Sequence, residues 1–144
     1  MEHTPKLIVS KDFTFEAAHR LPNYQGACKH LHGHSWKLTV AVRGPLDPAT
    51  GLVIDFRALK DIVQEHIIRS LDHGYLGQGD IFNSARGERF SAVFTEDFYP
   101  TSENLVMWIV KVLSSPLVLP NAVELYEVTL HETESSACTW RRDG

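Results

Sequence analysis

Three histidines in the first quarter of the chain have the spacing of metal ligands. Only Gly33 separates His32 from His34, and residues two apart on an extended backbone point to the same face, so both imidazoles can be directed at one point. His19 ends the strand-like segment that begins at Phe13 and supplies a third ligand. Catalytic zinc takes three protein ligands and leaves a fourth position open. We therefore predict an open zinc site at His19, His32 and His34.

Cys28 lies four residues before His32, and its thiol has two interpretations. It fits a fourth zinc ligand, and it fits equally a free thiol beside an open site, where a cation and imidazoles would ease its deprotonation. A structural zinc site is matched less well, because such sites close with four Cys or His ligands in paired short spacings. The chain has only one other cysteine, Cys138. A catalytic site is therefore favoured over a structural one and over chance clustering of the eight histidines.

Composition limits the classes of protein to which the chain can belong. Its 144 residues, 43% hydrophobic and 22% charged, fit a single globular domain over residues 1–144. A net charge of -4 argues against a nucleic-acid partner. No apolar run is long enough to span a bilayer, and no signal-peptide pattern opens the sequence, so we expect a cytoplasmic protein with no membrane partner.

Hydrophobic periodicity predicts alternating strands before and after two helices. Strands are predicted over 7–17, 35–44, 122–133 and 137–142, with a short strand around 90–94. One helix begins after the N-cap residue Asp55 and runs to about Ser70. A second begins at Thr101 or Ser102 and runs to Leu113. This order favours an α+β fold with two antiparallel helices on one face of an antiparallel sheet.

Six segments resemble the family of 6-pyruvoyltetrahydropterin and 6-carboxytetrahydropterin synthases, in family order over almost the whole chain. They are Phe15-Glu16-Ala17-Ala18-His19, Cys28 to His34, Val53-Ile54-Asp55-Phe56, Leu71-Asp72-His73, Pro100 to Leu105, and Glu132-Thr133. The resemblance implies a tunnelling fold, a homohexamer built as a dimer of trimers with its sites at subunit interfaces, and Zn²⁺ held by the three histidines.

The same resemblance implies the roles of several site residues. Cys28 would be the catalytic base, and Asp72 and His73 would complete a proton relay from a neighbouring subunit. Glu132 would anchor the pterin, because an ionised carboxylate accepts two adjacent N–H donors of the ring edge. Without the resemblance, Asp72 and His73 would be read as a helix C-terminal turn, and Glu132 as part of a solvated strand face.

Residues at the start of the second predicted helix have two readings. Thr101, Ser102 and Glu103 would add contacts to the pterin ring, or they are simply helix caps. Arg20, Lys29 and His30 are candidates for holding a triphosphate, although each also fits a solvated loop.

The implied activity is that of a zinc-dependent lyase acting on 7,8-dihydroneopterin triphosphate. Three residues separate Cys28 from His32, an interval that resembles the 6-carboxytetrahydropterin synthases of queuosine biosynthesis. Those enzymes release 6-carboxytetrahydropterin, acetaldehyde and triphosphate. The alternatives are a 6-pyruvoyltetrahydropterin synthase and a zinc- and pterin-binding protein without turnover. The segment 74–99 departs from the family by its length, which leaves substrate entry and side-chain specificity open.

Overall fold

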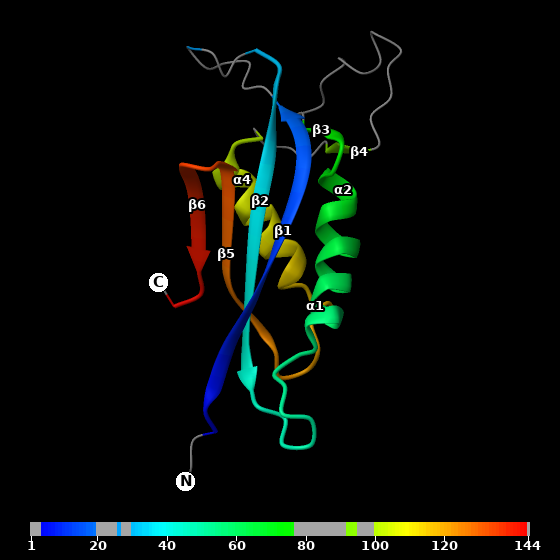
Figure 1. The fold of residues 1–144 in the computed structure, drawn as a ribbon, viewed down its shortest axis with the longest axis vertical. Helices are drawn as coiled ribbons and strands as arrows, with labels where there is room; N and C mark the ends of the chain where they lie inside the picture. Colours follow the sequence, from blue (N-terminus) through cyan, green and yellow to red (C-terminus); the bar gives the residue numbers. More distant parts are fainter. Residues whose placement is uncertain (1–3, 20–25, 27–29, 77–91, 95–99, 144) are drawn as a thin grey trace.

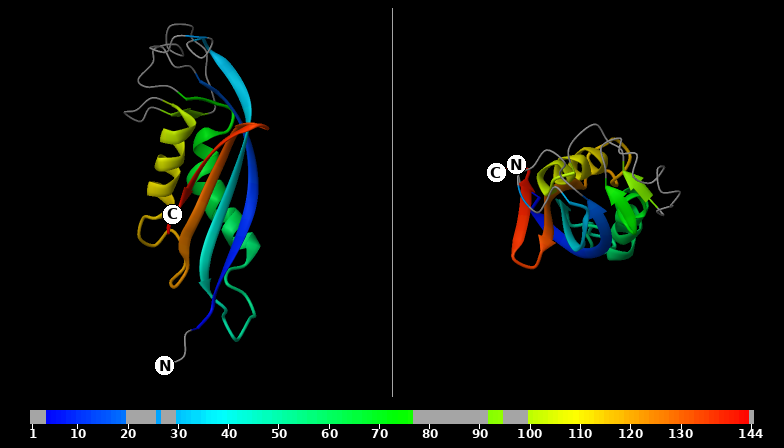
Figure 2. Two further views of the ribbon diagram at one scale, coloured as in Figure 1. Left: turned by 90° about the vertical axis from the view of Figure 1, so that its left-hand side faces the viewer. Right: turned by 90° about the horizontal axis from the view of Figure 1, so that it is seen from above.

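The chain folds into one mixed sheet with helices on one of its faces (Figures 1 and 2). The computed structural model describes residues 4–19, 26, 30–76, 92–94 and 100–143. Within them the sheet has six strands in the order β4-β3-β1-β2-β5-β6. This confirms the α+β class predicted from the sequence.

Four strands form the antiparallel part of the sheet. They are β1 (Lys6–His19), β2 (His32–Pro45), β5 (Glu124–Thr133) and β6 (Ser136–Arg141). The pairing of β1 with β2 runs without interruption from Lys6 opposite Pro45 to His19 opposite His32. Each strand overlaps the range predicted for it, and its first residue lies within three positions of the predicted start. The hydrophobic periodicity therefore located all four strands.

Two short strands extend the sheet in parallel, whereas the predicted sheet was antiparallel throughout. One of them, β4, confirms the short strand predicted around 90–94. They are β3 (Gly74–Leu76), paired with β1, and β4 (Ala92–Phe94), paired with β3. The physical reason is the direction of the chain. The helical segment after β2 returns to the end of the sheet where β1 finishes (Figure 1), so the strand that follows it continues in the direction of β1.

The first helical segment runs from Phe56 to Leu71. It consists of α1 (Phe56–Val63), a π-helical turn (Gln64–Ile68) and α2 (Arg69–Leu71). The predicted cap is confirmed, because the Asp55 carboxylate accepts a hydrogen bond of 2.8 Å from the backbone N–H of Arg57.

The second helix, α4, spans Ser102–Leu113 and runs antiparallel to α1 (Figure 1). Of the two predicted caps, Thr101 is the one used, since its hydroxyl accepts a 3.1 Å hydrogen bond from the backbone N–H of Asn104. None of the helices in the described ranges has the length and apolar character needed to cross a membrane.

The core lies between the helices and the inner face of the sheet. Alternation along β2 directs Trp36, Leu38 and Val40 inward, and all three are fully buried. The helices contribute the fully buried Leu59, Val63, Ile67, Leu105 and Ile109. This packing fixes the two strands whose ends carry the predicted metal ligands.

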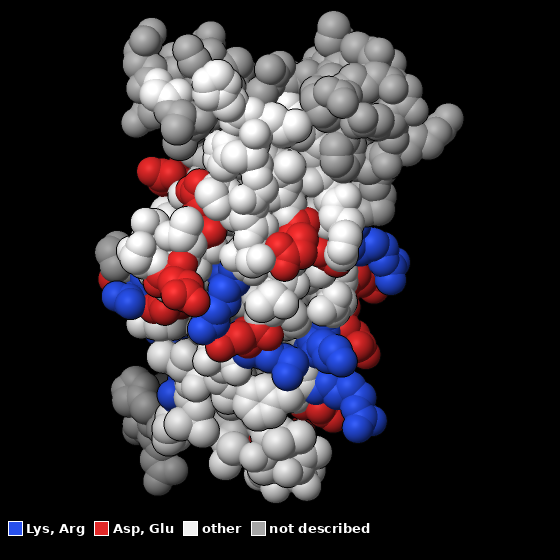
Figure 3. Space-filling model, turned by 45° about the horizontal axis from the view of Figure 1, so that its top comes forward, with Lys and Arg blue, Asp and Glu red and all other residues white. Residues whose placement is uncertain are grey.

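The outer face of the sheet carries polar side chains of both charges. Lys37 on β2 lies 3.6 Å from Asp12 on β1, and Asp12 also accepts a 2.7 Å hydrogen bond from Thr39. Figure 3 shows Lys and Arg side chains interspersed with Asp and Glu side chains on the surface in view. The helix-free face is therefore held by cross-strand polar pairs.

Candidate metal centre

The paired ends of β1 and β2 bring the three predicted ligands together. His19 stands directly opposite His32, and His34 stands opposite Ala17. Side chains two apart on each strand share a face, so His32 and His34 point to the same side as His19. The ligand atoms of these histidines and of Glu132 all lie within 4.8 Å of one another.

Backbone carbonyls fix two of the imidazoles. Nδ1 of His19 lies 2.8 Å from the carbonyl oxygen of Pro100, and Nδ1 of His32 lies 2.7 Å from that of His30. A carbonyl oxygen can only accept, so each Nδ1 carries the proton and each Nε2 keeps its lone pair. Hydrogen bonds of this kind orient histidine ligands and fix their tautomer in metal sites.

Glu132 on β5 is the fourth member of the cluster. Its Oε1 lies 2.9 Å from Nε2 of His34 and 3.4 Å from Nε2 of His19. The residue sits at an irregularity in the pairing of β5 with β6, and it shares the inward face with Leu130. The sequence indicated a pterin anchor at Glu132. Its place beside the histidines was missed, although the alternation of β5 could have revealed it.

Burial leaves two imidazole nitrogens in need of a partner. His19 is 1% exposed, and Nε2 of both His19 and His34 is buried without a regular hydrogen bond among the described residues. Burial also lowers the pKa of His19 and of His34, an effect that the Glu132 carboxylate opposes in both. Burial therefore favours the neutral form of both imidazoles, which is the form that binds a metal.

These observations fit a zinc ion. Neutral imidazole nitrogens and a carboxylate are donors that zinc accepts. Two buried Nε2 atoms that face one carboxylate oxygen across 2.9 and 3.4 Å are matched by an ion that all of them can bind. Of the residues that the structure describes, no other group of three or more His, Cys, Asp and Glu side chains meets the same geometric requirement.

Asp72 and His73 lie elsewhere, at the start of β3. The Asp72 carboxylate accepts a 2.9 Å hydrogen bond from the backbone N–H of Glu16 and lies 3.1 Å from Nδ1 of His73. His73 has a φ of 57°, and its backbone N–H donates to the Glu16 carbonyl at 2.6 Å. A positive φ in a residue other than glycine is strained and clusters at functional sites.

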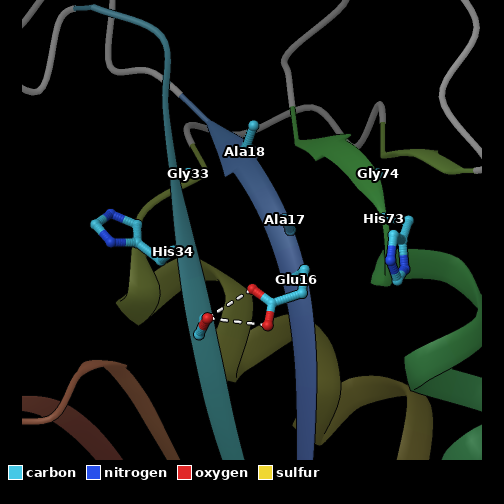
Figure 4. Close-up of a pocket in the computed structure, with 8 residues that line it drawn as sticks. Glu16, Ala17, Ala18, Gly33, His34, His73 and Gly74 are labelled. Atoms are coloured by element: carbon cyan, nitrogen blue, oxygen red, sulfur yellow. Dashed lines mark hydrogen bonds between the residues drawn. The ribbon is translucent and has the colours of Figure 1, made fainter.

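An open pocket of about 500 Å³ adjoins His73 on the outer face. Its lining includes Glu16 and Ser35, whose hydroxyl donates to the Glu16 carboxylate at 2.7 Å. In Figure 4, β1 and β2 separate the His73 imidazole from that of His34. His34 is also among the residues that line the pocket. Within one chain, the pocket therefore borders both His73 and one residue of the histidine cluster, while their imidazoles lie on opposite sides of the two strands.

The start of α4 adjoins the cluster through Pro100. Pro100 is buried, and the cap residue Thr101 follows it. The Ser102 hydroxyl donates to the Glu103 carboxylate at 3.0 Å. The capping reading of Thr101 is therefore confirmed, and its predicted contact with a pterin remains a prediction, as do those of Ser102 and Glu103.

Three other predicted residues lie outside the described residues. They are Cys28, Arg20 and Lys29. The remaining candidate for triphosphate binding, His30, is exposed, and its carbonyl is the one that orients His32.

Comparisons with known proteins find relatives that match nearly the whole chain. A family model described as 6-pyruvoyl tetrahydropterin synthase matches residues 8–143. A 6-carboxy-5,6,7,8-tetrahydropterin synthase from Synechocystis is 34% identical over 137 residues, which cover 92% of this chain and 92% of the relative. The human 6-pyruvoyl tetrahydrobiopterin synthase is 32% identical over 145 residues, which cover 92% of this chain and 90% of the human protein. The structure of the Caenorhabditis elegans 6-pyruvoyl tetrahydropterin synthase superposes with a TM-score of 0.75 at 27% identity, covering 99% of both chains.

Proposed function

Because the chain belongs to the 6-pyruvoyl tetrahydropterin synthase family, we propose that it is a zinc-dependent 6-carboxy-5,6,7,8-tetrahydropterin synthase. Its substrate would be 7,8-dihydroneopterin triphosphate, and its products 6-carboxytetrahydropterin, acetaldehyde and triphosphate, as a step in queuosine biosynthesis. The observation that carries this proposal is the cluster of His19, His32, His34 and Glu132. It supplies a set of zinc ligands next to a carboxylate able to bind a pterin.

The metal would be held by Nε2 of His19, His32 and His34. A bound zinc ion supplies Lewis-acid chemistry, which acidifies hydroxyl groups and stabilises developing negative charge. The carbonyls of Pro100 and His30 hold two of the rings in the required tautomer.

Glu132 would bind the pterin through the amino-pyrimidine edge. Two adjacent N–H donors of that edge match the two oxygens of a carboxylate. Its position within reach of the histidines means that an anchored pterin would carry its hydroxylated side chain next to the metal ligands. Thr101, Ser102 and Glu103 begin α4 at the same end of the fold and would add contacts to the ring.

Cys28 would act as the base that removes a carbon-bound proton. The sequence places it four residues before His32. Asp72 would hold Nδ1 of His73 and leave Nε2 to exchange the proton. Because His73 lies beyond β1 from the cluster of its own chain (Figure 4), the relay would come from a neighbouring subunit, as in a homohexamer of two trimers.

A 6-pyruvoyltetrahydropterin synthase is the second candidate. Relatives of similar identity carry each of the two names, so overall identity does not discriminate between them. The interval of three residues between Cys28 and His32 favours the carboxy-forming reaction. A zinc- and pterin-binding protein without turnover is a third candidate, against which the presence of Cys28, Asp72 and His73 argues.

A product assay distinguishes the three candidates. Purified zinc-loaded protein is incubated with 7,8-dihydroneopterin triphosphate, with the C28A variant as control. The pterin product is identified by mass spectrometry, and acetaldehyde is trapped. We expect 6-carboxytetrahydropterin with acetaldehyde, both absent with C28A. Accumulation of 6-pyruvoyltetrahydropterin without acetaldehyde would favour a 6-pyruvoyltetrahydropterin synthase. A substrate that is not consumed would favour a binding protein without turnover.

A further inference from the structure

One of the three histidines of the cluster lacks the backbone hydrogen bond that orients the other two. The carbonyls of Pro100 and His30 orient His19 and His32. In the described part of the chain, no carbonyl hydrogen bond is found for Nδ1 of His34. A histidine ligand usually donates its second ring N–H to a neighbour that sets its orientation. Among the described residues, the contacts of the His34 ring are instead with the Glu132 carboxylate, with the other two imidazoles and with one indole.

The neighbour that fills this role is the indole of Trp36. Its ring centroid lies 5.4 Å from that of His34, with the planes at 85°, and 5.2 Å from that of His19, with the planes at 78°. Both are edge-to-face arrangements, which are favourable between aromatic rings at such distances. A single indole thus contacts two of the three ligands.

The indole is itself fixed from two sides. Its Nε1–H donates a 3.2 Å hydrogen bond to the carbonyl oxygen of Ala17, the residue opposite His34. Phe15 stacks on it, with centroids 5.8 Å apart and planes 3° from parallel. The side chain is also fully buried. It cannot turn without breaking these contacts, so it presents a rigid surface to the imidazoles.

We infer that Trp36 is a positioning residue of the metal centre, whose indole holds the His34 imidazole in its ligating orientation. It performs by aromatic packing the task that two carbonyl oxygens perform for His19 and His32. This inference rests on the proposed function, because it assumes that the cluster holds a metal. It adds a residue that touches neither the metal nor the substrate.

The test compares metal binding by the wild type with W36F and W36L. Zn²⁺ affinity is measured by competition with a chelator, and ligand geometry by the visible spectrum of the Co²⁺-loaded protein. L38A is the matched control, since Leu38 is equally buried on the same face of β2, two residues further from the ligands. Thermal midpoints of the metal-free proteins measure the purely structural effect of each substitution.

We expect W36L to bind Zn²⁺ roughly tenfold more weakly, the usual cost of losing a residue that orients a ligand. W36F keeps an aromatic ring but loses the Nε1 donor, so it should recover part of the affinity and still show a shifted Co²⁺ spectrum. L38A should lose stability while its Zn²⁺ affinity and its Co²⁺ spectrum stay unchanged.

Wild-type affinity and an unchanged spectrum in W36L would overturn the role of Trp36. If W36L does not fold, an unchanged Co²⁺ spectrum in W36F would overturn it. An equal loss of Zn²⁺ affinity in L38A would also overturn the role of Trp36, because the effect would then follow from lower stability and not from contact with His34. A wild-type protein that bound no Zn²⁺ would instead contradict the proposed function.

Discussion

Each histidine of the cluster offers one nitrogen, so each should be needed for metal. Replacing His34 by Ala leaves the proposed three-histidine site with two of its ligands, since Glu132 is assigned to the pterin and not to the metal. We expect zinc content to fall from about one ion per chain to well below half. Elemental analysis of the purified protein measures it. H66A, which alters a histidine outside the cluster, should keep full zinc content, and full content in H34A would refute the ligand assignment.

Glu132 has two possible partners, the pterin and the metal, and one variant distinguishes them. E132A should weaken binding of a pterin ligand on the order of tenfold or more, since a charge-assisted pair of hydrogen bonds is lost. Calorimetry gives the dissociation constant, and elemental analysis gives the zinc content of the same sample.

Retained zinc with weaker pterin binding supports the anchor role. An unchanged dissociation constant would exclude that role. Loss of zinc would make Glu132 a metal ligand instead.

At the scale of residues, period-two spacing was enough to predict that His32 and His34 lie on one face, and the structure places His19 and Glu132 beside them. The position of His73 relative to the histidine cluster could not be predicted from such spacing. It depends on which side of β1 the start of β3 lies, and on a φ of 57° at His73. Both result from tertiary packing, for which the local sequence carries no signal.

Elements far from the metal centre are held by charge. At the other end of the sheet from the histidine cluster, β2 finishes and β5 begins. There the Arg43 guanidinium donates a 2.9 Å hydrogen bond to the Glu124 carboxylate. This bond lowers the pKa of Glu124 below its usual value of 4.5, and partial burial opposes the shift. A carboxyl whose pKa is lowered by folding stabilises the fold above its unfolded pKa, and this contribution disappears as the pH falls through the folded value.

E124Q should therefore lower the free energy of unfolding near neutral pH by roughly 0.2–1 kcal/mol, the range measured for largely exposed ion pairs. The difference from wild type should shrink as the pH falls below 4.5 and through the lowered pKa of Glu124, because the wild-type carboxyl then becomes protonated as well. Chemical denaturation at neutral pH and over a series of acidic pH values measures it. E134Q, in the exposed turn between β5 and β6, is the control, and a deficit in E124Q that persisted in acid would contradict this explanation.

The long strands and both helix starts were predictable, because alternation and capping residues act locally. The short strand predicted around 90–94 contains β4, whereas β3, with three residues, is too short for a periodic signal and was not predicted. Their pairing depends on where the preceding helix delivers the chain. The π-helical turn over Gln64–Ile68 was not predicted either, since its residues are ordinary helix formers.

The whole molecule raises the question of how two half-sites come together. The imidazoles of His34 and His73 lie on opposite sides of β1 and β2 in one chain (Figure 4), and the proposed reaction needs both. If subunits share sites, a chain with intact ligands can be completed by the His73 of a neighbour. Symmetric oligomers repeat such an interface at every subunit. The arrangement can be tested with two variants that are inactive for different reasons.

H34A lacks a metal ligand, and H73A lacks the proton relay, so each should be inactive alone. Unfolding and refolding them together in equal amounts should restore about a quarter of wild-type activity, because a site is intact when it combines the ligands of one variant with the His73 of the other. Light scattering before and after mixing verifies that oligomers form.

A mixture of H34A with C28A is the matched control, since both substitutions affect the same half-site and no combination yields an intact site. Activity in neither mixture, from hexamers shown to contain both variants, would mean that each chain builds its site alone and that His73 has another role.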